Sequence, residues 1–293
     1  MSNYKRILIT GGSGRVGSRL VEGLESIFLD DFPENVDLLM HENQIEINFS
    51  SSLNVRVVEH VNREYDLAIH LAANANTRFT ENPEYRESIR ESNVGLTQKV
   101  CDYSDKVIFT STDQVFKGDL REGEEYFEDD ERNPCSFYGQ TKAEAEDVVL
   151  NSNGCVLRFQ TVTGVKNRIT GKAIDVIKGG KEIPFYSDNI LKTTHLPDVI
   201  KVLRMLAESF RGGVYHIASN GEPLSRYEMA KEILRTYQDW GIYRVRDNIK
   251  GETHLEIPRR LSLNSDKAQK EFGFNFTDVK QSLREQALWE YDK

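Results

Sequence analysis

The stretch KRILITGGSGRVGSRLVEGL, residues 5–24, joins a short apolar run to a glycine-rich turn and then to a helical pattern. The apolar run at 5–10 predicts a short buried strand. Val16, Leu20 and Leu24 recur at the spacing of one helix face, which predicts a helix after the turn. Strand, glycine turn and helix form the opening of a βαβ unit, so the chain begins as an α/β fold.

The glycines of this turn have the spacing of a phosphate-binding loop, GxxGxxG. Glycine lets the backbone turn tightly and approach a pyrophosphate, and the helix N-terminus adds unpaired N–H groups and positive potential. The position between a strand and a helix favours dinucleotide binding over a purely structural turn. We expect the loop to bind the cofactor through Gly11, Gly14, Arg15, Val16 and Gly17.

Strand-like and helix-like segments alternate as far as residue 164. The expected strands are 5–10, 36–40, 66–73, 106–112 and 155–164, and the expected helices are the second half of 11–24, 51–62, 83–104 and 136–151. This alternation predicts an α/β, Rossmann-type doubly wound parallel sheet with helices on both faces. Ligands bind such sheets at the carboxyl ends of the strands. The segments TGGSG (10–14), LAANAN (71–76) and STDQVF (111–116) all fall at such ends.

The alternation loosens after about residue 165, which predicts a second, smaller lobe. The elements expected beyond that point are one more strand at 213–219, a helix at 225–241 that begins at the N-cap candidate Ser225, and a helix that ends at Gly273. We expect residues 1–164, with about 194–220, to form a dinucleotide-binding Rossmann domain. We expect about 165–193 and 221–293 to form a substrate-binding lobe.

The composition excludes several classes of protein. Lys and Arg total 38 against 47 Asp and Glu, and the net charge of −9 argues against a nucleic-acid partner. No segment has the apolar length of a membrane span or the pattern of a signal peptide, so we expect a soluble cytoplasmic protein without a membrane partner. The three cysteines form no CxxC pair, which favours reduced thiols. None of the six histidines has metal-ligand spacing, so no metal is expected.

Three local features have an ordinary structural interpretation. The acidic stretch EGEEYFEDDE, residues 122–131, is expected to be a solvated loop. His70 lies in a predicted strand and is expected to be a core residue. Cys135 lacks a visible base partner, so we interpret it as a small packing residue.

The stretch SFYGQTKAEAE, residues 136–146, places Tyr138 and Lys142 four residues apart. On a helix these side chains lie on the same face, one turn apart. A free phenol titrates near about 10, and a neighbouring ammonium favours phenolate and lowers that pKa. The pair therefore fits a proton donor with its pKa-tuning group, and it equally fits a half-buried tyrosine beside a surface lysine.

Two hydroxyl side chains, Ser111 and Thr112, end the predicted strand at 106–112, where they either contact a ligand or satisfy turn amides. With the glycine turn and the Tyr–Lys pair they form a constellation. In this constellation the sequence resembles the extended short-chain dehydrogenase/reductase superfamily, and within it the dTDP-4-dehydrorhamnose reductase group. The resemblance spans nearly the whole chain and is carried by ITGGSGRVGSRL, HLAANAN, ESNVGLTQKV, STDQVFKGD, YFEDDERNPCSFYGQTKAEAE, VLRFQTVTG, GVYHIASNGEPLSRYEMAKEI and RRLSLNSDKAQKEFGF.

The resemblance implies an NAD(P)H-dependent oxidoreductase that reduces a nucleotide-linked 4-keto-6-deoxysugar. It implies that Tyr138 donates the proton, that Lys142 lowers its pKa and holds the nicotinamide ribose, and that Thr112 bonds the carbonyl oxygen. Asn93 matches an asparagine beside the site and is interpreted as structural support. The implied cofactor contacts beyond the glycine turn are Ala72, Ala73, Asn74, Tyr138 and Lys142.

The implied substrate contacts are Ser111, Thr112, Asp113, Gln114, Thr161, Arg259 and Arg260. Sugar-nucleotide dehydratases carry Asp-Glu where this chain has Asp113 and Gln114, and a glutamine cannot take the proton, so dehydration is disfavoured. Thr161 stands where the rhamnose reductases usually have tryptophan, and Arg78 stands where they have an acidic residue. Because both positions should face the substrate, the identity of the sugar is left open.

Arg259 and Arg260 lie near the segment where the family binds the nucleotide diphosphate. The planar guanidinium of arginine can donate two hydrogen bonds to a phosphate. The alternative interpretation is a pair of surface arginines on the second lobe. No clear acidic residue follows the second strand to hold an NAD ribose, whereas Arg15 could meet a 2′-phosphate or remain solvated. NADP(H) is therefore slightly favoured over NAD(H).

Two further functions stay open beside the reductase. The same residues serve a sugar-nucleotide epimerase that keeps its cofactor tightly bound. The altered substrate-side positions also fit a non-catalytic, dinucleotide-binding regulatory subunit, as one relative is for methionine adenosyltransferase. A nucleotide sugar is the expected ligand, and a homodimer is left open as the assembly.

Overall fold

The computed structural model describes residues 4–12, 14–22, 35–39, 55–58, 61, 64–75, 80–165, 168–179, 183–241, 249–253 and 260–291. The chain divides into two compact units. Unit 1 comprises Met1–Val115, Pro134–Arg158 and Val199–Tyr215, and unit 2 comprises Phe116–Asn133, Phe159–Asp198 and His216–Lys293. Residues 116–133 and 159–164, which the sequence-based division placed in the Rossmann domain, fall in unit 2.

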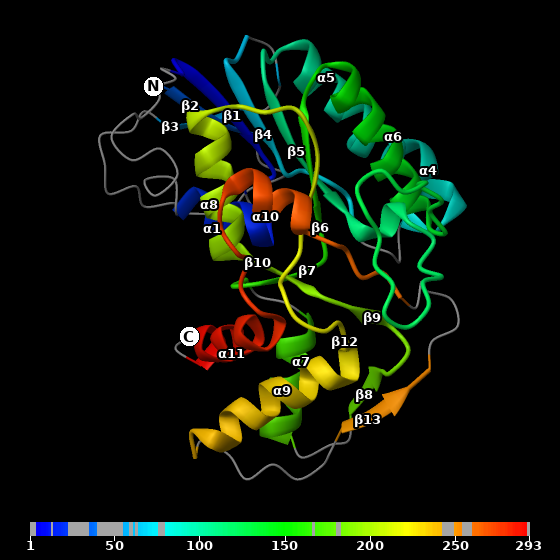
Figure 1. Cartoon of the computed structure of the whole chain (residues 1–293). Helices are drawn as coiled ribbons and strands as arrows, with labels where there is room; N and C mark the ends of the chain where they lie inside the picture. The colour runs from blue at the N-terminus through cyan, green and yellow to red at the C-terminus, as the bar shows by residue number, and fades with distance from the viewer. Residues whose placement is uncertain are drawn as a thin grey trace. The chain divides into compact units, whose positions relative to one another are not determined.

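A parallel sheet forms the framework of unit 1 (Figure 1). Its seven strands are β1 (Arg6–Thr10), β2 (Asn35–Leu39), β3 (Val55–Val58), β4 (Leu67–His70), β5 (Val107–Thr112), β6 (Cys155–Phe159) and β11 (Gly213–Ile217). Their order is β11-β6-β5-β4-β1-β2-β3, and the pairs β1–β2, β1–β4, β2–β3 and β4–β5 are parallel. The order reverses beside β1, which is the switch point where doubly wound sheets bind ligands. The predicted α/β, Rossmann-type fold is confirmed.

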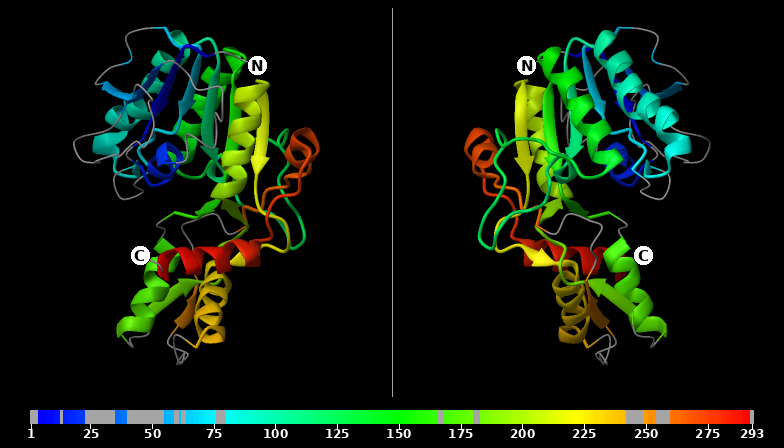
Figure 2. Two further views of the ribbon diagram at one scale, coloured as in Figure 1. Left: turned by 90° about the vertical axis from the view of Figure 1, so that its left-hand side faces the viewer. Right: turned by 90° about the vertical axis from the view of Figure 1, so that its right-hand side faces the viewer.

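Helices cover both faces of this sheet. They are α1 (Arg15–Glu22), α5 (Leu96–Asp102), α6 (Phe137–Asn151) and α8 (Leu196–Glu208). Helices α5 and α6 lie on one face, and α1 and α8 lie on the other (Figures 1 and 2). Because both faces are covered, the inner strands are buried throughout, as Ile7, Leu8 and Ile9 of β1 show at 0% exposure. Under α5 and α6, Phe109 and Val149 belong to one apolar cluster.

Two sequence-based elements were wrong in type or extent. The segment expected as a helix at 51–62 contains strand β3, which pairs with β2. Its residues VRVV are mostly β-branched, and a short apolar run cannot be distinguished from a helix by periodicity alone. The single strand expected at 155–164 is divided into β6 and β7 (Thr161–Thr163), and β7 pairs instead with β10 (Thr193–His195).

The long helix expected at 83–104 is continuous but changes its winding. It consists of the 3₁₀ turn η1 (Pro83–Tyr85), α4 (Arg86–Arg90), the π-helical turn η2 (Glu91–Gly95) and α5. A π turn inserts one extra residue and is frequent at functional sites. Here it carries Asn93, whose side chain is buried.

Unit 2 packs helices around its own apolar core. Beside β7 and β10, its elements are the segment 116–133, α7 (Arg168–Gly179), β8 (Ile183–Tyr186), β9 (Ile190–Leu191), β12 (Leu224–Ser225), α9 (Arg226–Asp239), β13 (Ile249–Glu252), α10 (Asp266–Phe272) and α11 (Val279–Tyr291). Helix α9 packs against α7 and α11 (Figure 2). Met229, Ile233 and Leu283 lie in the core between them.

Both helix boundaries predicted for this unit are confirmed. The Ser225 side chain accepts a hydrogen bond from the Glu228 N–H, and the Glu228 side chain accepts one from the Ser225 N–H, which is a capping box. Gly273 ends α10 with φ of 70°, a left-handed conformation that favours glycine.

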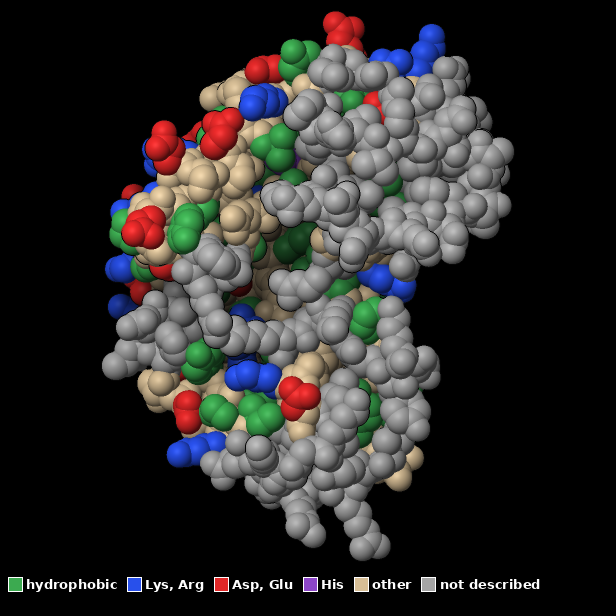
Figure 3. Space-filling model, turned by 180° about the vertical axis from the view of Figure 1, so that it is seen from behind, with side chains coloured by type: hydrophobic (Ala, Val, Ile, Leu, Met, Phe, Trp, Pro, Cys, Tyr) green, Lys and Arg blue, Asp and Glu red, His purple; other side chains and the backbone are tan. Residues whose placement is uncertain are grey.

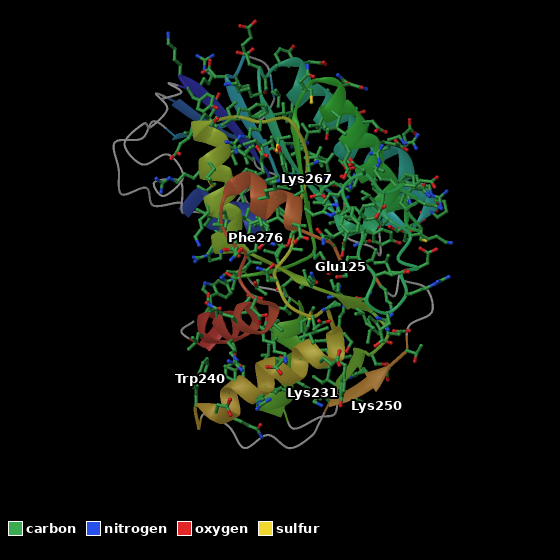
Figure 4. All side chains as sticks on the ribbon, in the orientation of Figure 1. Glu125, Lys231, Trp240, Lys250, Lys267 and Phe276 are labelled. Atoms are coloured by element: carbon green, nitrogen blue, oxygen red, sulfur yellow. The ribbon has the colours of Figure 1, made fainter. Side chains whose placement is uncertain are left out.

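The acidic stretch 122–131 is not simply solvated. Glu128 is buried and accepts a hydrogen bond from the His216 N–H at 3.0 Å. Glu125, labelled in Figure 4, forms an ion pair with buried Lys192 at 2.5 Å. Ser262 also donates to Glu125, so the stretch is held by paired carboxylates within unit 2.

The described surface contains charged side chains of both signs (Figure 3). On the face shown in Figure 3, acidic and basic side chains are interspersed among the described residues. Within the described ranges, no helix is both long and apolar enough to cross a membrane. Cys101 and Cys155 are buried, whereas Cys135 is exposed, so its interpretation as a packing residue was wrong.

A buried ion pair links α6 to β6 and gives a stability prediction. Arg158 donates two hydrogen bonds to Glu146, Nε at 3.0 Å and Nη2 at 2.8 Å, and both side chains are almost fully buried. Glu146→Leu leaves the guanidinium buried without this partner. We therefore expect the free energy of unfolding, measured in urea, to fall by about 3–5 kcal/mol. The double variant Glu146→Leu/Arg158→Met is expected to recover most of the loss, and a fully stable single variant would contradict the prediction.

Candidate functional site

The glycine turn packs backbone directly on backbone. Gly11 has φ of 71°, and a Cβ there would lie 2.7 Å from the Ala72 nitrogen. A Cβ at Gly17, inside α1, would overlap the Gly11 carbonyl oxygen. Gly14 donates its N–H to that oxygen at 2.9 Å. Side chains are therefore excluded at positions 11 and 17, and the start of α1 lies close against the end of β1.

An asparagine clamps the loop that follows β4. The Asn74 N–H donates to Asn93 Oδ1 at 2.7 Å, and Asn93 Nδ2 donates to the Asn74 carbonyl at 3.3 Å. Asn93 Nδ2 also donates to Thr141 Oγ1 on α6 at 3.0 Å. One buried side chain thus connects the π turn, the loop 71–75 and the helix of Tyr138.

The hydroxyl at the end of β5 is part of a tight turn. Thr112 Oγ1 donates to Asp113 Oδ1 at 3.0 Å and accepts the Gln114 N–H at 3.2 Å. Both Thr112 and Asp113 are buried, at 8% and 6% exposure. Ser111 Oγ is buried and has no hydrogen-bond partner among the residues that the structure describes.

Helix α6 begins against this turn, which is the 3₁₀ element η3 (Asp113–Val115). Ser136 caps α6 by accepting the Gly139 N–H at 3.0 Å. A Cβ at Gly139 would overlap the Gln114 carbonyl oxygen, so only glycine allows this approach. Tyr138, in the first turn of α6, is consequently held beside the segment that follows Thr112.

Lys142 lies on the same helix face one turn further on, and both it and Tyr138 are buried. Its Nζ donates to the Thr110 carbonyl at 2.7 Å and lies 3.7 Å from the centre of the Phe109 ring. The amine is thus directed at β5. The sequence predicted the shared face but not this contact with the strand.

Burial lowers the pKa of Lys142 to about 7, and the Glu146 carboxylate acts in the opposite direction. His70, at 0% exposure, has its pKa lowered to about 3 by burial first and by Lys142 second. His70 is therefore neutral near neutral pH, as expected of a core residue.

The structure gathers the expected residues of unit 1 at the carboxyl ends of three strands. After β1 come Gly11, Gly14, Val16 and Gly17, after β4 come Ala72, Ala73 and Asn74, and at β5 and α6 lie Ser111, Thr112, Asp113, Gln114, Tyr138 and Lys142. Thr161 and Arg260 belong to unit 2. Arg78, Arg259 and the Arg15 side chain lie outside the part of the chain that the structure describes.

Sequence reasoning missed the residues that hold this arrangement together. Asn93 was interpreted as support without its two partners, and Thr141 and Thr97 were not noticed. Helical spacing places Asn93 and Thr97 four residues apart, but the π turn that rotates Asn93 inward has no sequence signal. Among the described residues, no group of three or more His, Cys, Asp or Glu is placed to hold a metal ion.

The fold and this constellation define the chain as an extended short-chain dehydrogenase/reductase. More narrowly, it belongs to the RmlD substrate binding domain family, whose family model matches residues 5–292. The predicted family is thereby confirmed.

Similarity to known proteins extends over most of the chain. Methionine adenosyltransferase 2 subunit beta from Bos taurus is 26% identical over 253 residues, covering 80% of this chain and 72% of that protein. ADP-L-glycero-D-manno-heptose-6-epimerase from Brachyspira hyodysenteriae is 25% identical over 267 residues, covering 80% and 82%. The crystal structure of dTDP-4-dehydrorhamnose reductase from Bacillus anthracis, in complex with NADP, superposes with a TM-score of 0.75 at 20% identity, covering 97% and 99%.

The buried lysine predicts a pH-dependent stability. Its folded pKa of about 7 lies below the ordinary lysine value of 10.5, so the unfolded chain binds more protons between these values. The burial cost is complete below about pH 7 and fades as the pH rises toward about 10.5. We therefore expect Lys142→Met to raise the melting temperature relative to the wild type near about pH 6.5, and less so near about pH 9.5.

Thermal melts of both proteins over this pH range, without added ligand, check the prediction. The lost bond to Thr110 shifts the two curves by a constant, whereas the titration changes their separation with pH. A separation that is independent of pH would refute the lowered pKa.

Proposed function

We propose that the protein is an NAD(P)H-dependent reductase of a nucleotide-linked 4-keto-6-deoxysugar. One observation carries the proposal: α6 places Tyr138 and Lys142 on a single buried face and begins against the turn after Thr112. This arrangement brings a proton donor, a nearby amine and a second hydroxyl to one strand end. Ketone reduction needs these groups because a proton must reach the oxygen as the carbon is reduced.

The glycine turn fits a dinucleotide. Gly11 and Gly17 leave no space for side chains, so a pyrophosphate can approach the backbone at the start of α1. Ala72, Ala73 and Asn74 follow β4 at the neighbouring strand end, where Asn93 fixes the Asn74 backbone. The choice between the two dinucleotides rests on the sequence alone, and we favour NADP(H) slightly over NAD(H).

When bound, a nicotinamide would supply the hydride for the keto carbon. Tyr138 donates the proton to the developing alkoxide oxygen, and Thr112 Oγ1 donates a hydrogen bond to it in place of Asp113. Lys142 has three N–H donors, of which one is directed at Thr110. The others are available to the nicotinamide ribose, and a charged Lys142 favours the phenolate form of Tyr138.

The substrate end of the proposal involves unit 2, with about 165–193 and 221–293 as the expected substrate lobe. Arg260 is half-buried there, and its N–H donates to the Gly118 carbonyl at 3.0 Å. Leu261, the next residue, donates to the Ile190 carbonyl at 3.0 Å, so this backbone is fixed. The Arg260 guanidinium makes no hydrogen bond or ion pair with any residue that the structure describes, which supports a role in binding the nucleotide diphosphate.

A non-catalytic regulatory subunit is the second candidate. It is favoured by the 26% identity to the beta subunit of methionine adenosyltransferase 2 and by Thr161 and Gln114 at the substrate side. The buried pair Tyr138 and Lys142 argues against it, because a binding subunit has no need of a proton donor. An epimerase would use the same residues and would retain its dinucleotide through purification.

Oxidation of NADPH and NADH by the purified protein tests the proposal. The substrates are dTDP-, GDP- and UDP-linked 4-keto-6-deoxysugars, each with each cofactor. Steady consumption of one cofactor with one sugar is the expected result. Failure with all of them would overturn the reductase. Absorbance of a retained dinucleotide would then indicate the epimerase, and a stoichiometric enzyme partner would indicate the regulatory subunit.

Tyr138→Phe removes the proton donor and keeps the ring. We expect turnover to fall by about 100-fold or more while dinucleotide affinity changes little, since general acid catalysis has this magnitude. Tyr237→Phe is a matched control, because Tyr237 is also buried and its hydroxyl donates to Ala287 in unit 2. Full activity of Tyr138→Phe would exclude the assigned role.

Arg260→Met removes the proposed diphosphate contact. We expect the KM for the nucleotide sugar to rise about 10-fold with the KM for the cofactor unchanged, as for loss of a charged hydrogen bond. Arg204→Met is the control, since the Arg204 side chain on α8 is 44% exposed and pairs with Glu208. An unchanged sugar KM in steady-state kinetics would reject this contact.

A further inference from the structure

A chain of buried hydrogen bonds links the ends of β1 and β4 to the π turn. Thr10 and His70 are partners in the parallel register of these strands, and both are at 0% exposure. Thr10 Oγ1 lies 2.5 Å from His70 Nδ1, and His70 Nε2 lies 2.9 Å from Thr97 Oγ1. Thr97 Oγ1 donates to the Asn93 carbonyl at 2.6 Å, and the Ala72 N–H donates to Thr10 Oγ1 at 3.2 Å.

The direction of every bond in this chain follows from its two ends. Thr97 has a single hydroxyl proton, which it donates to the Asn93 carbonyl, so His70 Nε2 must carry a proton and donate to Thr97. His70 Nδ1 is then the acceptor of the Thr10 hydroxyl proton. A second proton at Nδ1 would charge the ring, which burial disfavours. The neutral Nε2–H tautomer is the one that satisfies all the partners.

Both ends of the chain reach the segments that would surround a dinucleotide. At one end, the Ala72 backbone is the surface against which Gly11 packs. At the other, the side chain of Asn93 clamps Asn74 and contacts Thr141 on α6. His70 lies at the centre of this chain of hydrogen bonds. Its ring bonds to Thr10 and Thr97 there, and it reaches the glycine turn and α6 only through these partners.

We propose that His70 is a positioning residue that sets the glycine turn, the loop 71–75 and α6 at fixed spacing, so that the dinucleotide site is formed before the ligand binds. The inference rests on the dinucleotide site of the proposed function and is independent of the sugar. A site formed in advance avoids the ordering cost on binding. An apolar ring would fill the same space but would leave the hydroxyls of Thr10 and Thr97 without their shared partner.

Thr97 offers the sharpest test because it can be changed without altering the size of the core. Thr97→Val removes the acceptor for His70 and the donor to Asn93, whereas Thr97→Ser keeps the hydroxyl. Thr236→Val is a matched control, because Thr236 is buried on α9 and its hydroxyl also donates four residues back, to Glu232 at 2.8 Å. His70→Phe is the second variant and keeps the ring packing against Phe109.

The affinity for NADPH and NADH is measured by cofactor fluorescence on each full-length protein, with thermal melts to confirm folding. We expect Thr97→Val and His70→Phe to weaken binding about 10-fold, the loss for one buried hydrogen bond left unmade. Thr97→Ser should bind like the wild type. Thr236→Val should lower the melting temperature without changing the affinity.

Two results would overturn the inference: unchanged affinity of the folded Thr97→Val protein, or an equal loss in Thr236→Val. In both, the wild type binds dinucleotide and the proposed function stands. A wild type that binds neither dinucleotide would overturn both proposals. A wild type that binds but reduces no sugar would remove only the reductase.

Discussion

The backbone at the end of β1 leaves no space for side chains, and the site depends on this constraint. The Gly11 carbonyl occupies the position that a side chain at Gly17 would need, and Ala72 closes the other side of the turn. The same device recurs where Gly139 packs on the Gln114 carbonyl. Backbone atoms are far less mobile than side chains, so two helices begin at fixed positions relative to the strand ends.

Buried polar side chains of unit 1 fix the remaining contacts between its strands, loops and helices. Asn93, Thr97 and His70 satisfy one another and the nearby backbone, which offsets the cost of removing them from water. Lys142 is different, because burial brings its pKa to about 7. A group with such a pKa changes its protonation in response to small changes of its surroundings, which is a common property of functional sites.

The two units contain different parts of the site in the proposed function. Unit 1 contains Thr112, Tyr138 and Lys142, to which the proposed reduction assigns its roles. The positions that differ from the pattern of the rhamnose reductases lie in both units, since Gln114 belongs to unit 1 and Thr161 to unit 2. Family membership therefore restricts the type of reaction more than it restricts the identity of the sugar.

The sequence by itself determined the sheet class, the glycine turn, the shared face of Tyr138 and Lys142, and the capped helix at Ser225. Each depends on local spacing, which periodicity and capping rules can predict. Only the tertiary structure decided that VRVV is a strand beside β2, that Lys142 bonds Thr110, and that Asn93 clamps Asn74. These features join residues distant in sequence, and their energies come from packing and burial, which no local pattern records.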